Sequence, residues 1–317
     1  HLLEPSRLQL IQYSEDFSNA YWTKTNTTVT SGFLSPDGTN NAFKLISNNG
    51  GNIIARPSIS LNTNHATSIY LKRVSGNGNV SIFKPNGNEQ IITLTDEWQR
   101  FTDINSVNPS NAYMGVRLYG LNDEILIYGF QLEEGSYPTS YIPNYGTSAG
   151  ITRSAETANG AGDASTFNDS EGVLMAEISA LADTAYMALG SDSNNRVMLG
   201  ASNGNVRSYN KIGGTVIDFT SSIIASNNNK LAIKYKSGNT DFYINGVKVF
   251  ESSTVFSAST PFDEIIFGNL IGGTQNFYGN TKQIQYFDSA LNDSDLETIT
   301  SWTSFTDLAN GQTYSIK

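Results

Sequence analysis

The chain consists mainly of short segments in which apolar and polar residues alternate, separated by turn-forming residues. A period of two places successive side chains on opposite faces, which is typical of a half-buried β-strand. Turn residues such as Ser35-Pro36-Asp37-Gly38 separate the segments. The first half is expected to hold seven strands, at residues 41–47, 67–73, 79–84, 90–94, 99–104, 112–119 and 124–132. This strand number fits a jelly roll.

A segment with two prolines, Pro138 and Pro143, follows the last of these strands. Because proline biases the residue before it toward an extended conformation, we expect a stiff connector whose tyrosines pack on the first domain. Strands resume near Gly172 after a stretch of small polar residues. The sequence therefore predicts two domains, residues 1–145 and residues 146–317.

The second half alternates in the same way. Asn245-Gly246 lies between two β-rich runs and is a strong signal for a two-residue hairpin turn. A short helix is expected at 290–297, with Asn292 as its N-cap. The expected strands are 172–179, 185–190, 196–201, 206–210, 230–236, 240–244, 247–251, 264–268 and 281–287. The predicted fold class is all-β, with two tandem antiparallel β-sandwiches, the second carrying a short C-terminal helix.

The composition narrows the functional classes. Charged residues make up 15% of the chain, which is low, and asparagine occurs 35 times. The net charge of −10 argues against nucleic acid and anionic membrane surfaces as partners. The absence of cysteine excludes disulfides and cysteine nucleophiles, and no apolar run has the ~18 residues that span a bilayer. We expect an extracellular protein and, because the chain starts at His1 without a signal pattern, a piece of a longer polypeptide or a processed product.

Residues for catalysis are few. A Ser-His-Asp triad would have to use His65, which we expect on the surface. Glu177 lacks the partner carboxylates that a glycosidase strand would place two and five residues later. We therefore expect a non-catalytic protein, although carboxylates from distant strands could still meet.

Two predicted strands, 67–73 and 112–119, carry aromatic and basic side chains opposite their apolar residues. These side chains are Tyr70, Lys72, Tyr113, Arg117 and Tyr119. Phenol rings stack on sugars, and cationic groups bond hydroxyls or acids. If both outer faces belong to one concave sheet, the five form a shallow glycan-binding groove. The alternative is that these tyrosines contact the second domain or a neighbouring subunit.

Tryptophans are the other candidate platforms for sugar rings. We expect Trp22 and Trp98 to be packing residues rather than sugar platforms, and Trp302 to cover the edge of the second core.

The first half resembles a module of bacteriophage tail fibres, tailspikes and related surface proteins, and is similar to the jelly-roll carbohydrate-binding modules of glycoside hydrolases. The motifs that carry the resemblance are Leu2-Leu3-Glu4-Pro5, Tyr13-Ser14-Glu15-Asp16-Phe17-Ser18, Glu97-Trp98-Gln99-Arg100, Gly129-Phe130-Gln131-Leu132-Glu133 and Tyr137-Pro138-Thr139-Ser140-Tyr141. Such modules often hold a structural calcium ion, and the resemblance implies Glu15, Asp16 and Glu133 as its ligands. Asp16 could equally be a turn residue.

The second half resembles a laminin-G/concanavalin-like sandwich of the pentraxin type. The motifs are Phe242-Tyr243-Ile244-Asn245-Gly246-Val247, Gln285-Tyr286-Phe287 and Ala290-Leu291 before the acidic helix. Domains of the family that it resembles bind glycans or proteins, some are catalytic and many are spacers. The fold alone therefore does not decide the function.

Together the two resemblances imply a non-catalytic, glycan-binding part of a phage tail fibre or similar surface adhesin, located outside cells or on a virion tail. The implied partners are cell-surface or extracellular polysaccharide and other fibre subunits, with homotrimers as the expected assembly. Two alternatives remain. One is a polysaccharide-degrading enzyme or its accessory binding module, and the other is a structural spacer of a virion fibre.

Overall fold

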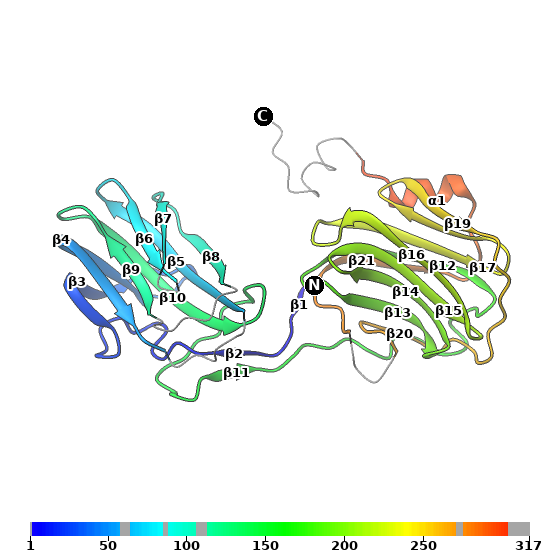
Figure 1. The fold of residues 1–317 in the computed structure, drawn as a ribbon, viewed down its shortest axis with the longest axis horizontal. Helices are drawn as coiled ribbons and strands as arrows, with labels where there is room; N and C mark the ends of the chain where they lie inside the picture. Colours follow the sequence, from blue (N-terminus) through cyan, green and yellow to red (C-terminus); the bar gives the residue numbers. More distant parts are fainter. Residues whose placement is uncertain (1, 58–63, 85–87, 106–112, 271–274, 304–317) are drawn as a thin grey trace. The chain divides into compact units, whose positions relative to one another are not determined.

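The computed structural model describes residues 2–57, 64–84, 88–105, 113–270 and 275–303 (Figure 1). Over these described residues the protein is all-β apart from one short helix. Its contacts divide it into two compact units, which we call the N-terminal unit, Ser6–Ala155, and the C-terminal unit, His1–Pro5 with Glu156–Lys317. The boundary expected after residue 145 stays a prediction.

The N-terminal unit contains all seven strands expected there, together with three that the pattern did not reveal. The additional strands are β2 (Arg7–Gln9), β3 (Thr23–Phe33) and β11 (Ile151–Arg153). The expected strands are β4 (Ala42–Ala55), β5 (His65–Ser75), β6 (Asn79–Phe83), β7 (Glu89–Thr93), β8 (Gln99–Asn105), β9 (Met114–Leu118) and β10 (Glu124–Glu134).

Strand β4 is shared between two layers of the N-terminal unit. Its residues 43–46 pair with β10, whereas its residues 52–55 pair with β9. From there β10 continues to β5 and β8, and β9 continues to β6 and β7. Inward residues of both groups, such as Ile69 and Val116, belong to one hydrophobic core. The two groups of strands therefore face each other across that core, as in a sandwich.

The connector after β10 packs on the N-terminal unit, as expected. The ring of Tyr141 lies 5.5 Å from that of Tyr128, and the Arg7 guanidinium lies over the ring of Tyr137. The buried amide of Gln131 accepts from the backbone N–H of Ile142 at 2.6 Å. These contacts fix the connector against the outer face of β10.

The C-terminal unit also contains every strand and the helix that the sequence predicted for it. The elements are β12 (Glu171–Ala180), β13 (Ala185–Asp192), β14 (Asn195–Ser202), β15 (Asn205–Ile212), β17 (Asn229–Lys236), β18 (Thr240–Ile244), β19 (Val247–Ser252), β20 (Glu264–Ile266), β21 (Gly279–Phe287) and α1 (Asp293–Thr300). Two strands were not expected, β16 (Thr215–Ile224) and the two-residue β1 (Leu2–Leu3).

These strands form two sheets, one of six strands in the order β1-β21-β12-β17-β18-β19 and one of five in the order β16-β15-β14-β13-β20. A single core of apolar side chains, including Leu174, Leu199 and Phe242, lies between them. Helix α1 buries Leu296 against the outer face of the six-stranded sheet (Figure 1). As expected, the Asn292 side chain accepts from the backbone N–H of Asp295 and caps this helix.

The first residues of the chain belong to the C-terminal unit. Leu2 and Leu3 of β1 pair with Asn280 and Gly279 of β21, and Leu3 is buried. The edge of the six-stranded sheet is therefore completed by a strand more than 270 residues distant in sequence.

Candidate functional site

Strand β9 presents three of the five predicted glycan-binding residues on one face of the N-terminal unit. Met114, Val116 and Leu118 are fully buried in the core. Because side chains alternate along a strand, Tyr113, Arg117 and Tyr119 point away from that core. This part of the sequence-based prediction agrees with the structure.

Arg117 is held by a carboxylate from two strands away. Its Nη1 lies 2.8 Å from Oε1 of Glu89 on β7, with β6 between the two strands. The guanidinium lies over the ring of Phe83, with its central carbon 5.1 Å from the ring centroid. Phe83 also packs edge-on against Tyr113, whose ring centroid is 5.1 Å away. Phe83 therefore forms an apolar floor under the ion pair.

Tyr119 extends the same arrangement. Its hydroxyl bonds to the Ser81 hydroxyl on β6 and donates to Glu89 Oε2 at 3.4 Å. Tyr119 is 43% exposed and the Arg117 side chain is 39% exposed, so both remain reachable from solvent. We call the set Ser81, Phe83, Glu89, Tyr113, Arg117 and Tyr119 the β9 patch. It combines an exposed aromatic ring, a guanidinium, hydroxyl groups and a carboxylate on one sheet face.

Tyr70 and Lys72 are not part of this patch, so the expectation of one groove made by all five residues is wrong. Both lie on β5, whose inward residues Ile69 and Leu71 are in the core. Strand β5 belongs to the layer that faces the β9 layer across that core, so the outer faces of the two strands point in opposite directions. Alternation within each strand was readable from the sequence, but the assignment of the strands to layers was not.

Tyr70 instead belongs to an aromatic row on the outer face of β5 and β10. Its ring lies 5.9 Å from that of Tyr128 and under the guanidinium of Arg100. The Tyr128 hydroxyl donates to Asp37 at 2.8 Å and to Glu15 at 3.3 Å. Burial and these carboxylate acceptors raise the pKa of Tyr128. The hydroxyls of Ser35, Thr39 and Tyr128, with the backbone N–H of Thr39, hold the pKa of Asp37 below its usual range.

The three carboxylates expected to bind calcium do not fit that role. Glu133 is fully buried and is satisfied by protein donors, with the Thr139 N–H at 2.6 Å, the Thr139 hydroxyl at 2.7 Å and the Gln131 amide at 2.8 Å. Arg7 lies 3.6 Å away and provides a compensating charge. This carboxylate holds the connector on β10, and both of its oxygens accept hydrogen bonds from protein donors.

Glu15 and Asp16 have separate protein partners. Glu15 accepts from Asn41 and Tyr128, whereas Asp16 accepts from the Ser18 N–H and hydroxyl, which makes it a turn residue. Across the described residues, no three acidic, histidine or cysteine side chains converge in a way that could hold a metal ion. Calcium requires six to eight oxygen ligands, and these three residues do not assemble such a set.

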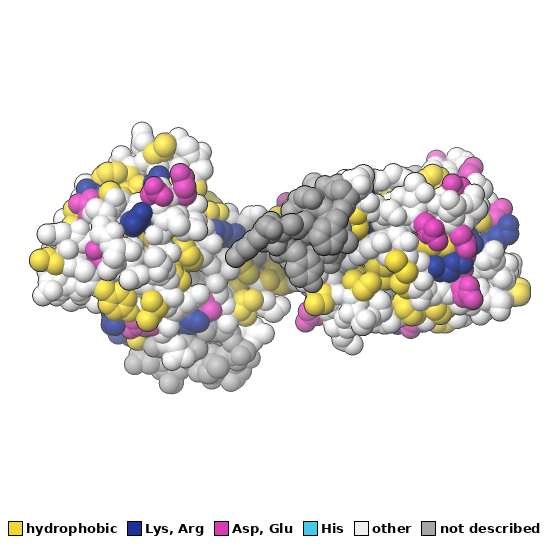
Figure 2. Space-filling view, turned by 90° about the horizontal axis from the view of Figure 1, so that it is seen from above, with side chains coloured by type: hydrophobic (Ala, Val, Ile, Leu, Met, Phe, Trp, Pro, Cys, Tyr) yellow, Lys and Arg dark blue, Asp and Glu magenta, His cyan; other side chains and the backbone are white. Residues whose placement is uncertain are grey.

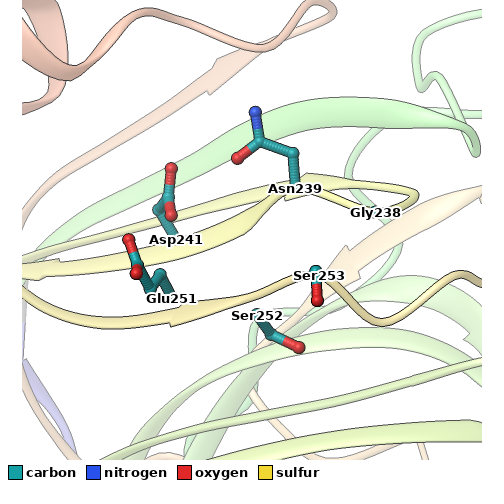
Figure 3. A pocket seen from close by; sticks show the side chains of 6 residues that line it. All are labelled: Gly238, Asn239, Asp241, Glu251, Ser252 and Ser253. Carbon is teal, nitrogen blue, oxygen red and sulfur yellow. The ribbon is translucent and has the colours of Figure 1, made fainter.

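The C-terminal unit has an open cavity of about 300 Å³ at the edge of its six-stranded sheet (Figure 3). Asp241 of β18 and Glu251 of β19 face each other there as a cross-strand pair. The buried carboxylate of Asp241 is paired with the equally buried ammonium of Lys234, and Lys248 lies 3.9 Å from it. Since the charge of Asp241 is compensated within the chain, this cavity lacks a free catalytic or metal-binding carboxylate pair.

The remaining sequence-based expectations have mixed outcomes. Trp22 is fully buried in the core, as expected, and Trp98 is half-buried directly before β8. Trp302 lies under the ammonium of Lys230 and donates to Asn245. His65 is buried at the start of β5, so its expected surface position is wrong. Glu177 is paired with Lys282 at 3.3 Å on the outer face of β12.

Sequence reasoning missed Ser81, Phe83 and Glu89, three members of the β9 patch. Ser81 lies between the core residues Val80 and Ile82, so alternation along β6 could have identified it as outward-facing. Glu89 is the first residue of β7, one position before the strand expected at residues 90–94. Nothing in the local sequence indicates that its strand is two positions from β9.

Comparison with known families assigns a fold to the second half. Residues 165–297, less than half of the chain, match the Laminin_G_3 family model, described as "Concanavalin A-like lectin/glucanases superfamily". No curated protein sequence matches this chain. Among the described residues, no helix has the length and apolar character needed to cross a bilayer.

Solved structures provide distant similarities. A carbohydrate-binding module of a Ruminococcus gnavus sialidase, bound to α2,3 sialyllactose, has 14% identity and a TM-score of 0.38, covering 46% of this chain and 97% of its own. Domains LG4-5 of mouse laminin α1 have 10% identity and a TM-score of 0.31, covering 92% of this chain and 94% of their own. A tandem CBM22 fragment of Paenibacillus barcinonensis Xyn10C has 11% identity and a TM-score of 0.31, covering 91% of this chain and 99% of its own. These values are too low to transfer a function.

Proposed function

We propose that the chain is a non-catalytic, glycan-binding part of an extracellular surface adhesin, such as a phage tail fibre. The observation that carries this proposal is the β9 patch, where Arg117 and Tyr119 are exposed yet held in place by Glu89 and Ser81. Preorganised side chains lose little conformational entropy when a ligand binds. An exposed phenol ring beside a guanidinium fits a sugar, because the ring stacks on C–H groups while the cation bonds hydroxyl oxygens.

The rest of the surface supports a saccharide over a nucleic acid as the ligand. In the view of Figure 2, most of the surface is neither charged nor apolar, in keeping with the low content of charged residues. Neutral hydrogen-bonding side chains suit the hydroxyl groups of a neutral polysaccharide. The net charge of −10 disfavours a nucleic-acid backbone as partner.

A single shallow patch of this kind binds sugars weakly, so the proposal includes a homo-oligomer. In a fibre of three copies, binding of one site would hold the other two at a high effective concentration near a repeating surface polysaccharide. The overall affinity would rise without any new contact in a single subunit. The resemblance to tail-fibre modules supports this assembly, with cell-surface polysaccharide and other fibre subunits as partners. The C-terminal unit, of concanavalin-like fold, would be a second glycan-binding module or a spacer in the fibre.

The direct test is binding of the full chain to a printed array of bacterial and algal polysaccharides, together with its mass in solution. The proposal expects retention on at least one polysaccharide and a mass of a small oligomer. A monomer that binds no polysaccharide and no bacterial cell surface would contradict it. An oligomer without any such binding would instead favour the spacer function.

A second candidate function, polysaccharide hydrolysis, has one observation in its favour. The carboxylates of Glu15 and Asp37 are both within hydrogen-bond reach of the Tyr128 hydroxyl. Glycosidases use two nearby carboxyl groups. However, Tyr128 lies between these two, and Asp37 also accepts from Ser35 and Thr39. Release of oligosaccharides from any polysaccharide on the array, lost in Glu15→Gln, would establish hydrolysis in place of the binding function.

A further inference from the structure

A second open cavity of the C-terminal unit, of about 410 Å³, lies beside helix α1. Its lining residues are Ser294, Glu297, Thr298, Ser301, Trp302 and Thr303. The first four recur at intervals of three and four residues, so they share the face of the helix opposite Leu296, which packs on the six-stranded sheet. The volume is within the range of roughly 300–1,000 Å³ that is typical of ligand pockets.

The indole of Trp302 is held in place at this cavity by two neighbours. The ammonium of Lys230 lies 4.8 Å from the ring centroid and donates to the backbone carbonyl of Ser301 at 2.9 Å. The indole N–H donates to Oδ1 of Asn245 at 3.2 Å. Asn245 belongs to the turn between β18 and β19. Because its only polar atom is already bonded, the fixed indole provides the cavity with an apolar surface.

The polar groups of the cavity are acceptors of hydrogen bonds. The hydroxyl of Thr298 donates to the backbone carbonyl of Ser294 at 2.7 Å, and the hydroxyl of Ser301 donates to that of Glu297 at 2.6 Å. Since both hydroxyl protons are used within the helix, the two oxygens are left to accept. The side chain of Glu297 is exposed and has no ion pair or hydrogen bond within the described part of the chain.

This combination of groups fits a neutral sugar. The C–H groups of a sugar ring pack on an indole, and its hydroxyls donate to the acceptors. The Glu297 carboxylate would repel an anionic ligand. A cationic ligand on the indole would meet the charge of Lys230, which already lies over that ring.

We propose that this cavity binds a residue of a neutral polysaccharide, with the Trp302 indole as the platform and the Glu297 carboxylate as a hydroxyl acceptor. The inference rests on the proposed glycan-binding function for the class of ligand. It adds a second site, because the cavity lies in the C-terminal unit and the β9 patch lies in the N-terminal unit. The C-terminal unit is then a binding module and not a spacer.

The test measures binding of the full chain to dextran, mannan, galactan and xylan, each printed beside its carboxymethylated form. On at least one neutral polysaccharide, Trp302→Ala should weaken binding roughly tenfold or more. The control is Trp98→Ala, which removes a half-buried tryptophan outside this cavity and should bind like the wild type. Equal binding by Trp302→Ala and the wild type on every polysaccharide would overturn the inference. Loss of binding to the carboxymethylated forms as well as to the neutral ones would overturn the selection of a neutral ligand.

Tyr119→Ala separates this inference from the proposed function. If Tyr119→Ala loses binding while Trp302→Ala retains it on every polysaccharide, the β9 patch remains a glycan site and the cavity does not. If Trp302→Ala loses binding that Tyr119→Ala retains, the cavity is supported and the β9 patch is not. A wild-type chain that binds none of the polysaccharides would overturn both.

Glu297→Gln is a second variant that does not depend on the packing of Trp302. Because Glu297 is exposed, the melting temperature should stay unchanged. A neutral amide is a weaker acceptor than a carboxylate, so binding of the neutral polysaccharide should weaken about fivefold. The control is Asp295→Asn, at an exposed acid of the same helix that does not line the cavity, and it should bind like the wild type. Equal binding by these two variants would overturn the assignment of Glu297.

Discussion

The ion pair between Arg117 and Glu89 crosses an intervening strand, with Nη1 and Oε1 2.8 Å apart and the ring of Phe83 beneath the guanidinium. Strand β6 lies between β9 and β7, so this contact joins three strands into one surface. Both side chains are partly exposed, so the pair adds little to the free energy of unfolding. Its main effect is to fix the guanidinium in a position that is open to solvent.

Glu89→Gln tests this positioning. Loss of the carboxylate frees Arg117 to adopt several rotamers, so polysaccharide binding should weaken about three- to tenfold, an ordering cost of roughly 0.5–1.5 kcal/mol. The melting temperature should change little. The measurement is a binding titration with the polysaccharide that the array retains most strongly.

The matched control for this variant is Glu124→Gln, which breaks a comparably exposed ion pair with Lys44 in the same unit. It should leave polysaccharide binding unchanged. If the two variants lose binding equally, the Arg117–Glu89 pair has no special part in recognition.

Glu133→Gln should destabilise the N-terminal unit. The buried carboxylate accepts from Thr139 and Gln131 at three positions, and an amide would turn one acceptor into a donor facing these groups. Arg7 would also lose its partner charge. We expect a loss of about 2–4 kcal/mol in the free energy of unfolding, measured by denaturant titration. The neighbouring Glu134→Gln should cost much less, and equal losses would exclude this role for Glu133.

Leu3→Ala tests whether the first residues stabilise the C-terminal unit. Leu3 is buried beside β21, and removing a buried leucine side chain costs about 2–5 kcal/mol. Calorimetry should show a lower transition temperature for the C-terminal unit in this variant. Leu2→Ala, at a partly exposed position of the same strand, should have a smaller effect. Identical transitions in Leu3→Ala and the wild type would mean that β1 contributes no stability.

The stability contributed by Asp293 should depend on pH. Its hydrogen bond with Lys248, at 2.7 Å, lowers the pKa of Asp293 and raises that of Lys248. A carboxyl whose pKa is lower in the folded state stabilises above its unfolded pKa of about 4 and loses this effect as the pH falls. A lysine whose pKa is raised stabilises below about pH 10.4 and loses this effect as the pH rises.

Asp293→Asn should therefore melt below the wild type near pH 7, and the difference should shrink below about pH 4 and above about pH 10.4. Melting temperatures across this pH range provide the measurement. The control is Glu297→Gln, in the same helix, because Glu297 has no ion pair within the described residues. A difference between Asp293→Asn and the wild type that is constant with pH would contradict the prediction.

Much of the fold was predictable because buried strands alternate clearly. The expected strands at residues 79–84 and 240–244 correspond to β6 and β18, whose inward side chains are large and apolar. Strand β3 was missed because most of its residues are Thr, Ser or Asn, and β16 because Val216 and Ile224 are exposed and blur its alternation. Local periodicity reports burial, so strands with little buried surface give a weak signal.

The candidate sites were less predictable, because they depend on the register of strand pairing and on the layer to which each strand belongs. Arg117 and Tyr119 could be assigned to one face from their own strand. Their partners Glu89 and Ser81 come from β7 and β6, which pair as a hairpin, and only the long-range pairing of β6 with β9 brings them to this face. Glu133 was expected to bind calcium, but the connector that supplies the Thr139 donors folds back on it. Hydrogen-bond partners of a buried carboxylate are a tertiary property that spacing alone does not encode.

The most direct test of the β9 patch compares Tyr119→Ala with Tyr145→Ala in binding of the full chain to the polysaccharide array. Tyr145 is the matched control, since it is 73% exposed in the same unit and is not part of the patch. Loss of the Tyr119 ring should weaken binding roughly tenfold or more at an unchanged melting temperature, whereas Tyr145→Ala should bind like the wild type. Equal binding by Tyr119→Ala and the wild type would contradict the assignment of glycan binding to this surface.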